Sequence, residues 1–238
     1  MNSTLELKRV GISLAGHVLL PPLSLSVPAG EIVTVMGPSG SGKSTLLSFL
    51  CGTLDAAFTA TGRALLNGRD LTGLEPEQRR VGILFQDDLL FPHLSVGENL
   101  AFGLPPGLGK AARKARIEEA LRDADLVGFA NRDPARLSGG QRARIALLRT
   151  LMAEPQALLL DEPFSKLDMA LRDRVRRFVF DHARGQLLPT LLVTHDPADA
   201  AAAGGPVLEI GAEDTLLGDG QPATYRLGPL GEAGLSGE

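Results

Sequence analysis

The sequence predicts an α/β fold built on a mostly parallel sheet that is covered by helices. Three short runs of continuous apolar residues carry this prediction, at 32–36, 157–160 and 190–194. Runs of this length without polar alternation are typical of strands buried on both faces. Each run is followed by chemically useful residues, namely a glycine-rich loop, an Asp-Glu pair and a His-Asp pair. Because ligands gather at the carboxyl ends of strands in open α/β sheets, the three runs predict one common site.

The composition indicates a globular chain with a sizeable core. Its 238 residues are 44% hydrophobic, enough for one large domain, or one domain with a lobe. A formal charge of −4 gives no basic footprint, so we expect no nucleic-acid partner. Cys51, the only cysteine, follows an apolar run and is predicted to be a core residue. The N-terminus does not resemble a signal peptide and no run is long enough to span a membrane, so we expect a soluble cytosolic protein.

The segment Gly37–Ser44 matches the phosphate-loop pattern G-x-x-x-x-G-K-[ST]. Its glycines let backbone N–H groups turn toward phosphate oxygens, and the helix predicted to follow, at 45–50, offers its positive N-terminus. Lys43 is predicted to reach the β- and γ-phosphates, and Ser44 to hold Mg²⁺. The alternative, a chance Gly/Ser-rich turn, does not account for the strand before it and the helix after it. The residues predicted to bind nucleotide here are Gly37, Pro38, Ser39, Gly40, Ser41, Gly42, Lys43, Ser44 and Thr45.

Two adjacent acids end the second apolar run. Asp161 has the usual place of a carboxylate that helps to hold Mg²⁺, and Glu162 is the better candidate for orienting and polarising an attacking water. Phosphoryl transfer needs mostly positioning and charge neutralisation, so one acid for the metal and one for the water suffice. On their own the two acids would fit a solvated turn equally well. The phosphate loop favours the functional interpretation.

Two further polar residues follow predicted strands. Gln86 comes after Ile83–Phe85, where the chain leaves the core, and its amide could sense Mg²⁺ or water and pass that signal on. His195 follows the third apolar run and could donate to the γ-phosphate. A lone histidine at a strand end is more often structural, but this one follows the third of three converging strands. We therefore predict a catalytic site of Lys43, Gln86, Glu162 and His195, with Ser44, Gln86 and Asp161 near the metal.

The segment Ser138-Gly139-Gly140-Gln141 predicts a helix start with an unusual property. Serine followed three residues later by glutamine fits an ordinary capping box. A capping box does not explain two consecutive glycines in the first turn, each of which weakens a helix by roughly 1 kcal/mol. Bare backbone there permits an anion to approach the helix N-terminus closely. Because the phosphate loop already has its own helix, we expect this second anion site to serve the ATP of another subunit.

The middle of the chain differs in character from the core. Residues 110–126 and 139–153 are predicted helices, and 103–109, with two prolines, is a predicted loop. We therefore expect a domain at 1–227, with a core at 1–87 and 154–227 and an inserted helical lobe at 88–153. Residues 228–238 are predicted to be a flexible tail.

Over about residues 3–210 the chain resembles the ATP-binding subunits of bacterial ABC transporters. The motifs that carry the resemblance are Walker A at 37–44, the Q-loop at Gln86, the LSGGQ signature at 137–141, Walker B at Asp161 with Glu162, the D-loop at 165–168 and the H-loop at His195. The resemblance implies a P-loop NTPase (RecA-like) core, an antiparallel N-terminal β subdomain and an inserted α-helical lobe. It also implies a head-to-tail homodimer with ATP and Mg²⁺ sandwiched between Walker A of one subunit and Ser138, Gly139, Gly140 and Gln141 of the other, with Asp168 lying across the interface.

The segment 85–100 is similar to the importer branch that serves anions, ferric iron, polyamines and thiamine. That resemblance implies a membrane permease docked near Gln86–Phe102 and an extracytoplasmic solute-binding protein. It also implies a peripheral location on the cytoplasmic face of the inner membrane. The sequence does not name the solute.

Two positions depart from the pattern of this family. Its members usually stack an aromatic residue on the adenine, and the matching segment 11–17 has none, which leaves Ile12, Leu14 or His17 as the contact. Lys166 stands where a small residue is usual in the D-loop, and the sequence offers no reason for it.

Three alternatives remain at this point. A non-transport ABC ATPase usually carries long insertions or a second cassette, which this chain lacks. A P-loop kinase or GTPase would have no use for LSGGQ. A non-hydrolysing adaptor is disfavoured because both Glu162 and His195 are present.

Overall fold

The computed structural model describes residues 3–167, 169–210 and 227–228, and its N-terminal part forms an antiparallel sheet. The strands of this sheet, in spatial order, are β2 (His17–Pro28), β1 (Thr4–Leu14), β4 (Phe58–Leu66) and β5 (Arg69–Asp70). All of its pairings are antiparallel. The predicted antiparallel N-terminal β subdomain is confirmed.

The second sheet is mostly parallel, as predicted. Its strands, in spatial order, are β10 (Leu227–Gly228), β9 (Val207–Glu209), β3 (Ile32–Met36), β8 (Thr190–Val193), β7 (Ala157–Asp161) and β6 (Val81–Leu84). Only β10 runs antiparallel to its neighbour. The three strands predicted from apolar runs are adjacent, with β8 between β3 and β7, and β6 pairs with β7. The register places Val35 beside Val193 and Asp161 beside Val193, so these strands end at the same edge.

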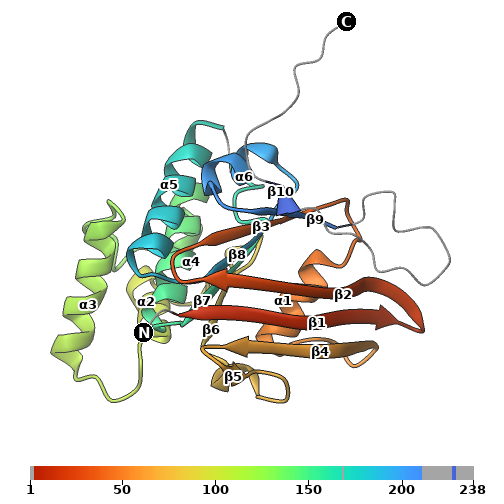
Figure 1. Cartoon of the computed structure of the whole chain (residues 1–238). Helices are drawn as coiled ribbons and strands as arrows, with labels where there is room; N and C mark the ends of the chain where they lie inside the picture. The colour runs from red at the N-terminus through yellow and green to blue at the C-terminus, as the bar shows by residue number, and fades with distance from the viewer. Residues whose placement is uncertain (1–2, 168, 211–226, 229–238) are drawn as a thin grey trace, which may run out of the picture.

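Helices cover both faces of the parallel sheet. The described helices are α1 (Lys43–Cys51), α2 (Val96–Gly103), α3 (Lys110–Asp123), α4 (Gly139–Met152), α5 (Met169–Gly185) and α6 (Pro197–Ala203), with 3-10 turns at Pro76–Gln78 and Pro134–Arg136. Helices α1, α4, α5 and α6 lie against the sheet, while α2 and α3 pack on α4. Figure 1 shows α1 behind the N-terminal sheet, and α4, α5 and α6 on the opposite side of the parallel sheet. Alternate residues of β7 accordingly enter two cores: Leu159 packs with α1, and Leu158 and Leu160 pack with α4 and α5.

The helices predicted in the middle of the chain form, with small differences at their ends. Helix α3 ends at Asp123 rather than 126, because Asp125 takes a positive φ of 56° that ends the helix. Helix α4 ends at Met152, one residue earlier than expected. Helix α2 was not predicted, and it begins with a capping box of Ser95 and Glu98. Apolar residues of α2, α3 and α4 form a core of their own, although the boundaries at 88 and 153 stay predictions.

Helix α1, which begins at the phosphate loop, is fixed at its far end by a buried arginine. The Arg79 guanidinium donates from Nη1 to the carbonyl oxygens of Phe49 at 2.6 Å and Leu50 at 3.1 Å. Cys51 is buried beside this contact, as predicted, and burial raises its pKa to about 12. Unpaired carbonyls at a helix end need a donor, so Arg79 anchors the helix that presents the phosphate loop.

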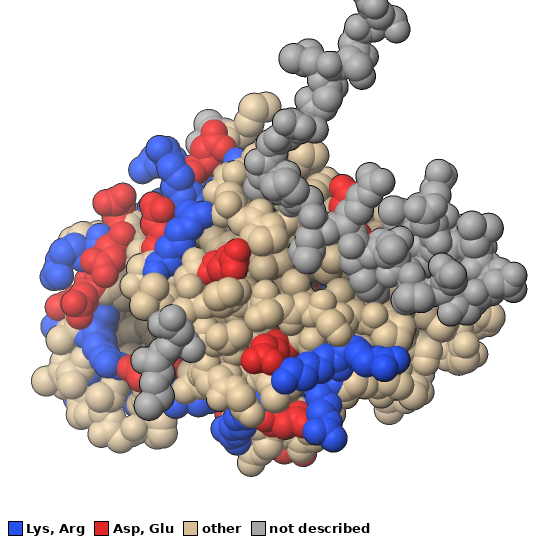
Figure 2. Space-filling view, in the orientation of Figure 1, with Lys and Arg blue, Asp and Glu red and all other residues tan. Residues whose placement is uncertain are grey.

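Charged side chains of both signs are interspersed on the molecular surface. Figure 2 shows them over α3 and α5 and over β4 and β5, with no one-sign basic field on the face in view. The predicted lack of a nucleic-acid partner stays a prediction. Among the residues that the structure describes, no helix has the length and apolar character needed to cross a membrane.

The anchoring role of Arg79 can be tested by substitution. Arg79→Met removes its hydrogen bonds to the carbonyls of Phe49, Leu50 and Leu74, and we expect the free energy of unfolding to fall by about 2 kcal/mol. Arg80→Met, which changes the exposed neighbouring arginine, should cost no more than about 0.5 kcal/mol. Urea denaturation measures both. Equal losses in the two variants would contradict the anchoring role.

Candidate functional site

The phosphate loop lies between β3 and α1, and its lysine is held inward. Lys43 Nζ donates to the carbonyl oxygens of Gly37 at 2.8 Å and Pro38 at 2.7 Å. Burial lowers the pKa of Lys43, while the carboxylates of Glu162 and Asp161 act in the opposite direction. Gly42 precedes the helix with a φ of 86°, and no side chain caps the helix start. An ammonium group beside an uncapped helix N-terminus is suited to phosphate oxygens.

Ser44 and Asp161 meet at the end of β7. The Ser44 hydroxyl donates to Asp161 Oδ1 at 3.0 Å, which joins the phosphate loop directly to the strand that carries the acids. Burial raises the pKa of Asp161, and the hydrogen bond from Ser44 opposes that shift. Within the described ranges no three His, Cys, Asp or Glu residues cluster as a metal site. A hydroxyl and a carboxylate are hard oxygen ligands, and they fit Mg²⁺ because this ion usually takes one or two protein ligands beside phosphate oxygens and water.

Glu162 and His195 form the next pair along the sheet edge. His195 Nδ1 lies 3.2 Å from Glu162 Oε1, and the Glu162 N–H donates to the carbonyl of Val193 at 2.9 Å. Glu162 has a φ of 45°, a strained conformation for a residue other than glycine, and the Ser165 hydroxyl donates to its carbonyl at 2.9 Å. Strain of this kind costs about 1–3 kcal/mol and concentrates at functional sites. The structure thus brings together two of the predicted catalytic side chains.

The LSGGQ segment forms a capping box, which is the simpler of the two interpretations of its sequence. Gln141 Oε1 accepts from the Ser138 N–H at 2.9 Å, and Ser138 Oγ accepts from the Gln141 N–H at 3.4 Å. A Cβ at Gly140 would lie 2.2 Å from the Leu171 side chain, so Gly140 packs closely against α5. This packing gives Gly140 a structural reason beside its predicted role in anion binding, which stays a prediction. At Gly139 the nearest neighbour would be Leu167 at 3.8 Å, so Gly139 has no such packing reason and keeps the backbone open.

Gln86 is not joined to the Ser44–Asp161 pair. Its side chain is exposed, and no hydrogen bond within the described part of the chain links it to Ser44 or Asp161. It lines a cavity of about 260 Å³ together with Gly139 and Lys166. Lys166 pairs with Asp87 across this cavity, which gives the unexpected D-loop lysine a physical reason. Asp168, predicted to bind nucleotide across a dimer interface, lies outside the described residues.

The three residues predicted as adenine contacts differ in how far their side chains are exposed. Ile12 is 2% exposed and belongs to the core, so the expectation that it touches the base is wrong. Leu14 is 41% exposed, and His17, its cross-strand partner at the β1–β2 turn, is also exposed. Leu19 is the bulged residue of β2 near this turn. A Cβ at Gly42 would lie 3.0 Å from its side chain, so β2 packs directly against the phosphate loop. Leu14 and His17 remain candidates.

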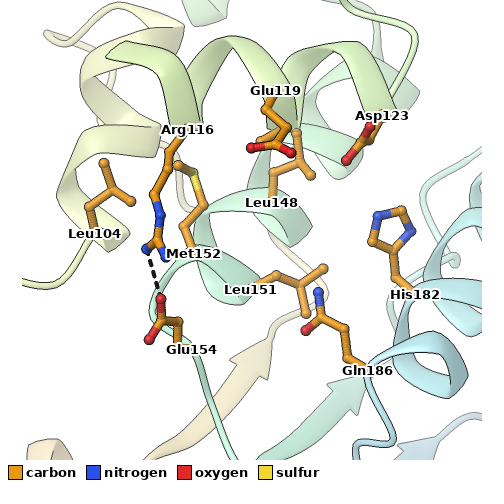
Figure 3. Close-up of a pocket in the computed structure, with 11 residues that line it drawn as sticks. Leu104, Arg116, Glu119, Asp123, Leu148, Leu151, Met152, Glu154, His182 and Gln186 are labelled. Carbon is orange, nitrogen blue, oxygen red and sulfur yellow. Dashed lines mark hydrogen bonds and ion pairs between the residues drawn. The ribbon is translucent and has the colours of Figure 1, made fainter. Parts of the chain in front are cut away.

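A second cavity lies apart from all of these motifs. Figure 3 shows its walls, which come from α3, α4 and α5 and enclose about 200 Å³. Leu148 and Leu151 form an apolar side, Glu119 and Asp123 stand on α3, and His182 faces them from α5. The His182 Nδ1 lies 3.1 Å from the Phe178 carbonyl of its own helix. None of the predicted site residues reaches this cavity.

Three buried polar residues close to this site were not predicted from the sequence. Arg176, Thr194 and Asp199 are all buried and bonded to one another. Only the spacing of arginines on α5 and the polar residues after β8 could have suggested them, and neither pattern shows burial.

Comparison with known proteins agrees with the site. Residues 20–165 match the family model described as ABC transporter. The chain is 50% identical over 195 residues, 82% of its length and 90% of the relative's, to an uncharacterised ABC transporter ATP-binding protein, YnjD, of Escherichia coli K12. It is 49% identical over 173 residues to a thiamine import ATP-binding protein of Cereibacter sphaeroides, covering 72% of this chain and 74% of the relative. It is 43% identical over 191 residues to an Fe(3+) ions import ATP-binding protein of Rhizobium etli, covering 80% of this chain and 53% of the relative.

The fold and the phosphate loop define a P-loop NTPase. The chain belongs to the ABC transporter family, as one of its ATP-binding subunits with the ATPase chemistry of that family. The amino-acid sequences of its motif segments resemble those of Ynj-type importers, and the 50% identity to YnjD confirms that resemblance. The predicted nucleotide cofactor follows from the family. Mg²⁺ and the individual roles of the site residues remain proposals.

The raised pKa of Asp161 predicts a conflict between stability and function. A raised pKa means that the folded protein holds the ionised carboxylate less well than the unfolded chain does, so the charge lowers stability at neutral pH. In nucleotide-free protein, Asp161→Asn should therefore raise the free energy of unfolding by about 0.5–1 kcal/mol. The gain should shrink as the pH falls through the raised pKa, because the wild-type acid then becomes neutral. Urea denaturation against pH measures this, and a destabilised Asp161→Asn variant would contradict it.

Proposed function

We propose that this chain powers solute import by binding and hydrolysing MgATP as a homodimer and acting on a separate membrane permease. The observation that carries the proposal is the row of contacts at one sheet edge, Ser44 with Asp161 and Glu162 with His195, beside the inward-held Lys43. These contacts place a phosphate-binding cation, two oxygen ligands and an acid–imidazole pair next to one another. Phosphoryl transfer to water needs this set of groups.

Each side chain has a role that follows from its position. Lys43 exchanges its loop carbonyls for the β- and γ-phosphate oxygens, and Ser44 and Asp161 hold Mg²⁺, which neutralises charge that develops on the phosphates. Glu162 orients and polarises the attacking water. His195 is held by Glu162 and donates to the γ-phosphate. Gln86 senses the metal and the water once the loop moves from its exposed position.

The second half of each site comes from the partner subunit. Ser138 and Gly139 start α4, and Gly139 has open space above its backbone. The N-terminus of a helix attracts anions, and the phosphates of the same subunit already have α1. Ser138, Gly139, Gly140 and Gln141 therefore face the γ-phosphate bound by the other subunit. Asp168 crosses the interface, and the arrangement is head to tail.

The permease docks near Gln86–Phe102. Two large apolar side chains of this segment, Leu89 and Phe102, are exposed, as is Phe85 directly before it. The Phe102 ring lies 4.8 Å from that of Phe91. Exposed apolar residues grouped in one segment mark an interaction surface. Because Gln86 belongs to the same segment, nucleotide contacts and permease contacts share one mobile connection.

The location of the subunit and the identity of the solute depend on the other proteins of the transporter. The subunit is peripheral, on the cytoplasmic face of the inner membrane, and works with an extracytoplasmic solute-binding protein. The relatives are named for import of Fe(3+) ions, spermidine/putrescine and thiamine. Solute choice belongs to the permease and the binding protein, so co-purifying them and asking which solute stimulates ATP hydrolysis identifies it.

The role of Glu162 gives a first test of this function. Glu162→Gln keeps the shape of the side chain but removes its charge, so ATP should still bind while turnover falls by about 100-fold or more. Light scattering should then detect an ATP-bound dimer that persists. A phosphate-release assay with Glu162→Asn as the shortened control measures turnover. Hydrolysis at the wild-type rate would sink the assignment.

Subunit mixing tests the shared site. Lys43→Ala disables the phosphate loop and Ser138→Arg blocks the signature, so each homodimer should be inactive while Ser138→Arg still binds ATP as a monomer. In a head-to-tail heterodimer one site carries both defects and the other is intact. An equal mixture should therefore regain roughly a quarter of the wild-type rate, since half the dimers are mixed and each has one working site. No recovery on mixing, with both proteins folded, would contradict the head-to-tail arrangement.

A further inference from the structure

Two arginines of α5 bind two aspartates that follow His195 in the sequence, Asp196 and Asp199. Arg172 and Arg176 are four positions apart and share one face of the helix. Arg172 Nη1 donates to Asp196 Oδ2 at 2.6 Å, and Asp196 directly follows His195. Arg176 Nε donates to Asp199 Oδ1 at 3.0 Å. Helix α5 therefore contacts both the N-cap of α6, directly after His195, and the first turn of α6.

The second contact continues to the residue before His195. Asp199 Oδ2 accepts from the Thr194 hydroxyl at 2.8 Å, and Thr194 Oγ1 in turn accepts from the Asp196 N–H at 3.0 Å. Arg176, Asp199 and Thr194 are 7%, 3% and 2% exposed, so this chain of bonds is shielded from water. Buried polar groups that satisfy one another rigidify the backbone that carries them. Both neighbours of His195 in the sequence are thus fixed.

The same helix contacts the segments that follow Glu162. The Arg176 guanidinium lies 5.9 Å from the ring centre of Phe164, a fully buried residue two positions after Glu162. Arg172 Nη2 donates to the carbonyl of Leu167 at 3.4 Å. Helix α5 begins two residues later, at Met169, so its first turns touch both loops that hold the acid–imidazole pair.

We propose that Arg172, Arg176, Asp199 and Thr194 are positioning residues that hold His195 against Glu162 from behind. The proposal rests on the catalytic role proposed above for His195. Helix α5 sets the separation of the two loops, so a displacement of its N-terminal end, where the D-loop enters, moves His195 relative to Glu162. The four side chains themselves do not touch nucleotide.

A purely stabilising role is the alternative to be tested. Replacing a buried ion pair with apolar residues is often neutral or stabilising, so burial alone gives a weak reason to keep Arg176 and Asp199 paired. Their bonds end on Thr194, next to the imidazole, which is where a positioning role requires them. The rate of ATP hydrolysis per folded molecule distinguishes a positioning role from a purely stabilising one.

Thr194→Val tests the network with the smallest change, because it removes only the buried hydroxyl. We expect kcat for ATP to fall by about tenfold with the Kd for MgATP unchanged, since a small misplacement of a catalytic group lowers the rate and leaves binding intact. Thr194→Ser should restore most of the rate. Asp173→Asn is the matched control, because Asp173 pairs with the same Arg176 but its side chain is 66% exposed. Arg172→Met tests the contact with Asp196, on the other side of His195. Because Thr194 is unchanged in this variant, any effect of the Thr194 substitutions on folding does not enter the result.

Two readouts separate this proposal from the proposed function. In a His195→Ala background, Thr194→Val should cause no further loss of kcat, because the hydroxyl acts only through the imidazole. The ring-nitrogen NMR signal of His195, one of four histidines, should shift in Thr194→Val and stay in place in Asp173→Asn. An unmoved signal with wild-type kcat, or an equal loss in the His195→Ala background, overturns the proposal. Full turnover of His195→Ala with a shifted signal in Thr194→Val would refute the catalytic role of His195 and keep the positioning.

Discussion

The common ending of four parallel strands is the constraint on which the rest of this structure depends. β3, β8, β7 and β6 lie side by side, so their carboxyl ends deliver the phosphate loop, His195, the two acids and Gln86 to one edge. Backbone pairing keeps these segments in register although they come from distant parts of the sequence. The Ser44–Asp161 hydrogen bond fastens the first of these ends to the third. A shift of one strand would separate the acids from the loop and leave an ordinary buried sheet.

This edge holds polar groups at a cost in stability. Burial opposes the charges of both Lys43 and Asp161, and Glu162 adopts a left-handed backbone conformation. The fold offsets these costs by packing apolar residues on both faces of β7 and by anchoring α1 through Arg79. Under the proposed function, bound phosphates would offset these costs by contacting Lys43 and the N-terminus of α1.

Much of this arrangement could be predicted from the sequence, because the signals are local. An apolar run followed by a glycine loop or an acid pair specifies a strand and its end within a few residues, and the ends of β3 and β7 agree with that prediction. Contacts between distant segments could not be predicted. The packing of Gly140 on Leu171, the pairing of Lys166 with Asp87 and the burial of Ile12 depend on tertiary neighbours. Helix α2 was missed because its eight residues, Val96–Gly103, are too few to show a helical period.

The central claim is that one chain holds only half of each catalytic site. The dependence of the ATPase rate on subunit concentration tests it most directly. At concentrations below the dimer dissociation constant, the rate per subunit should rise in proportion to concentration and then level off, because activity requires two subunits. A rate per subunit that stays constant over the whole range, in protein shown by light scattering to be monomeric, would contradict the account.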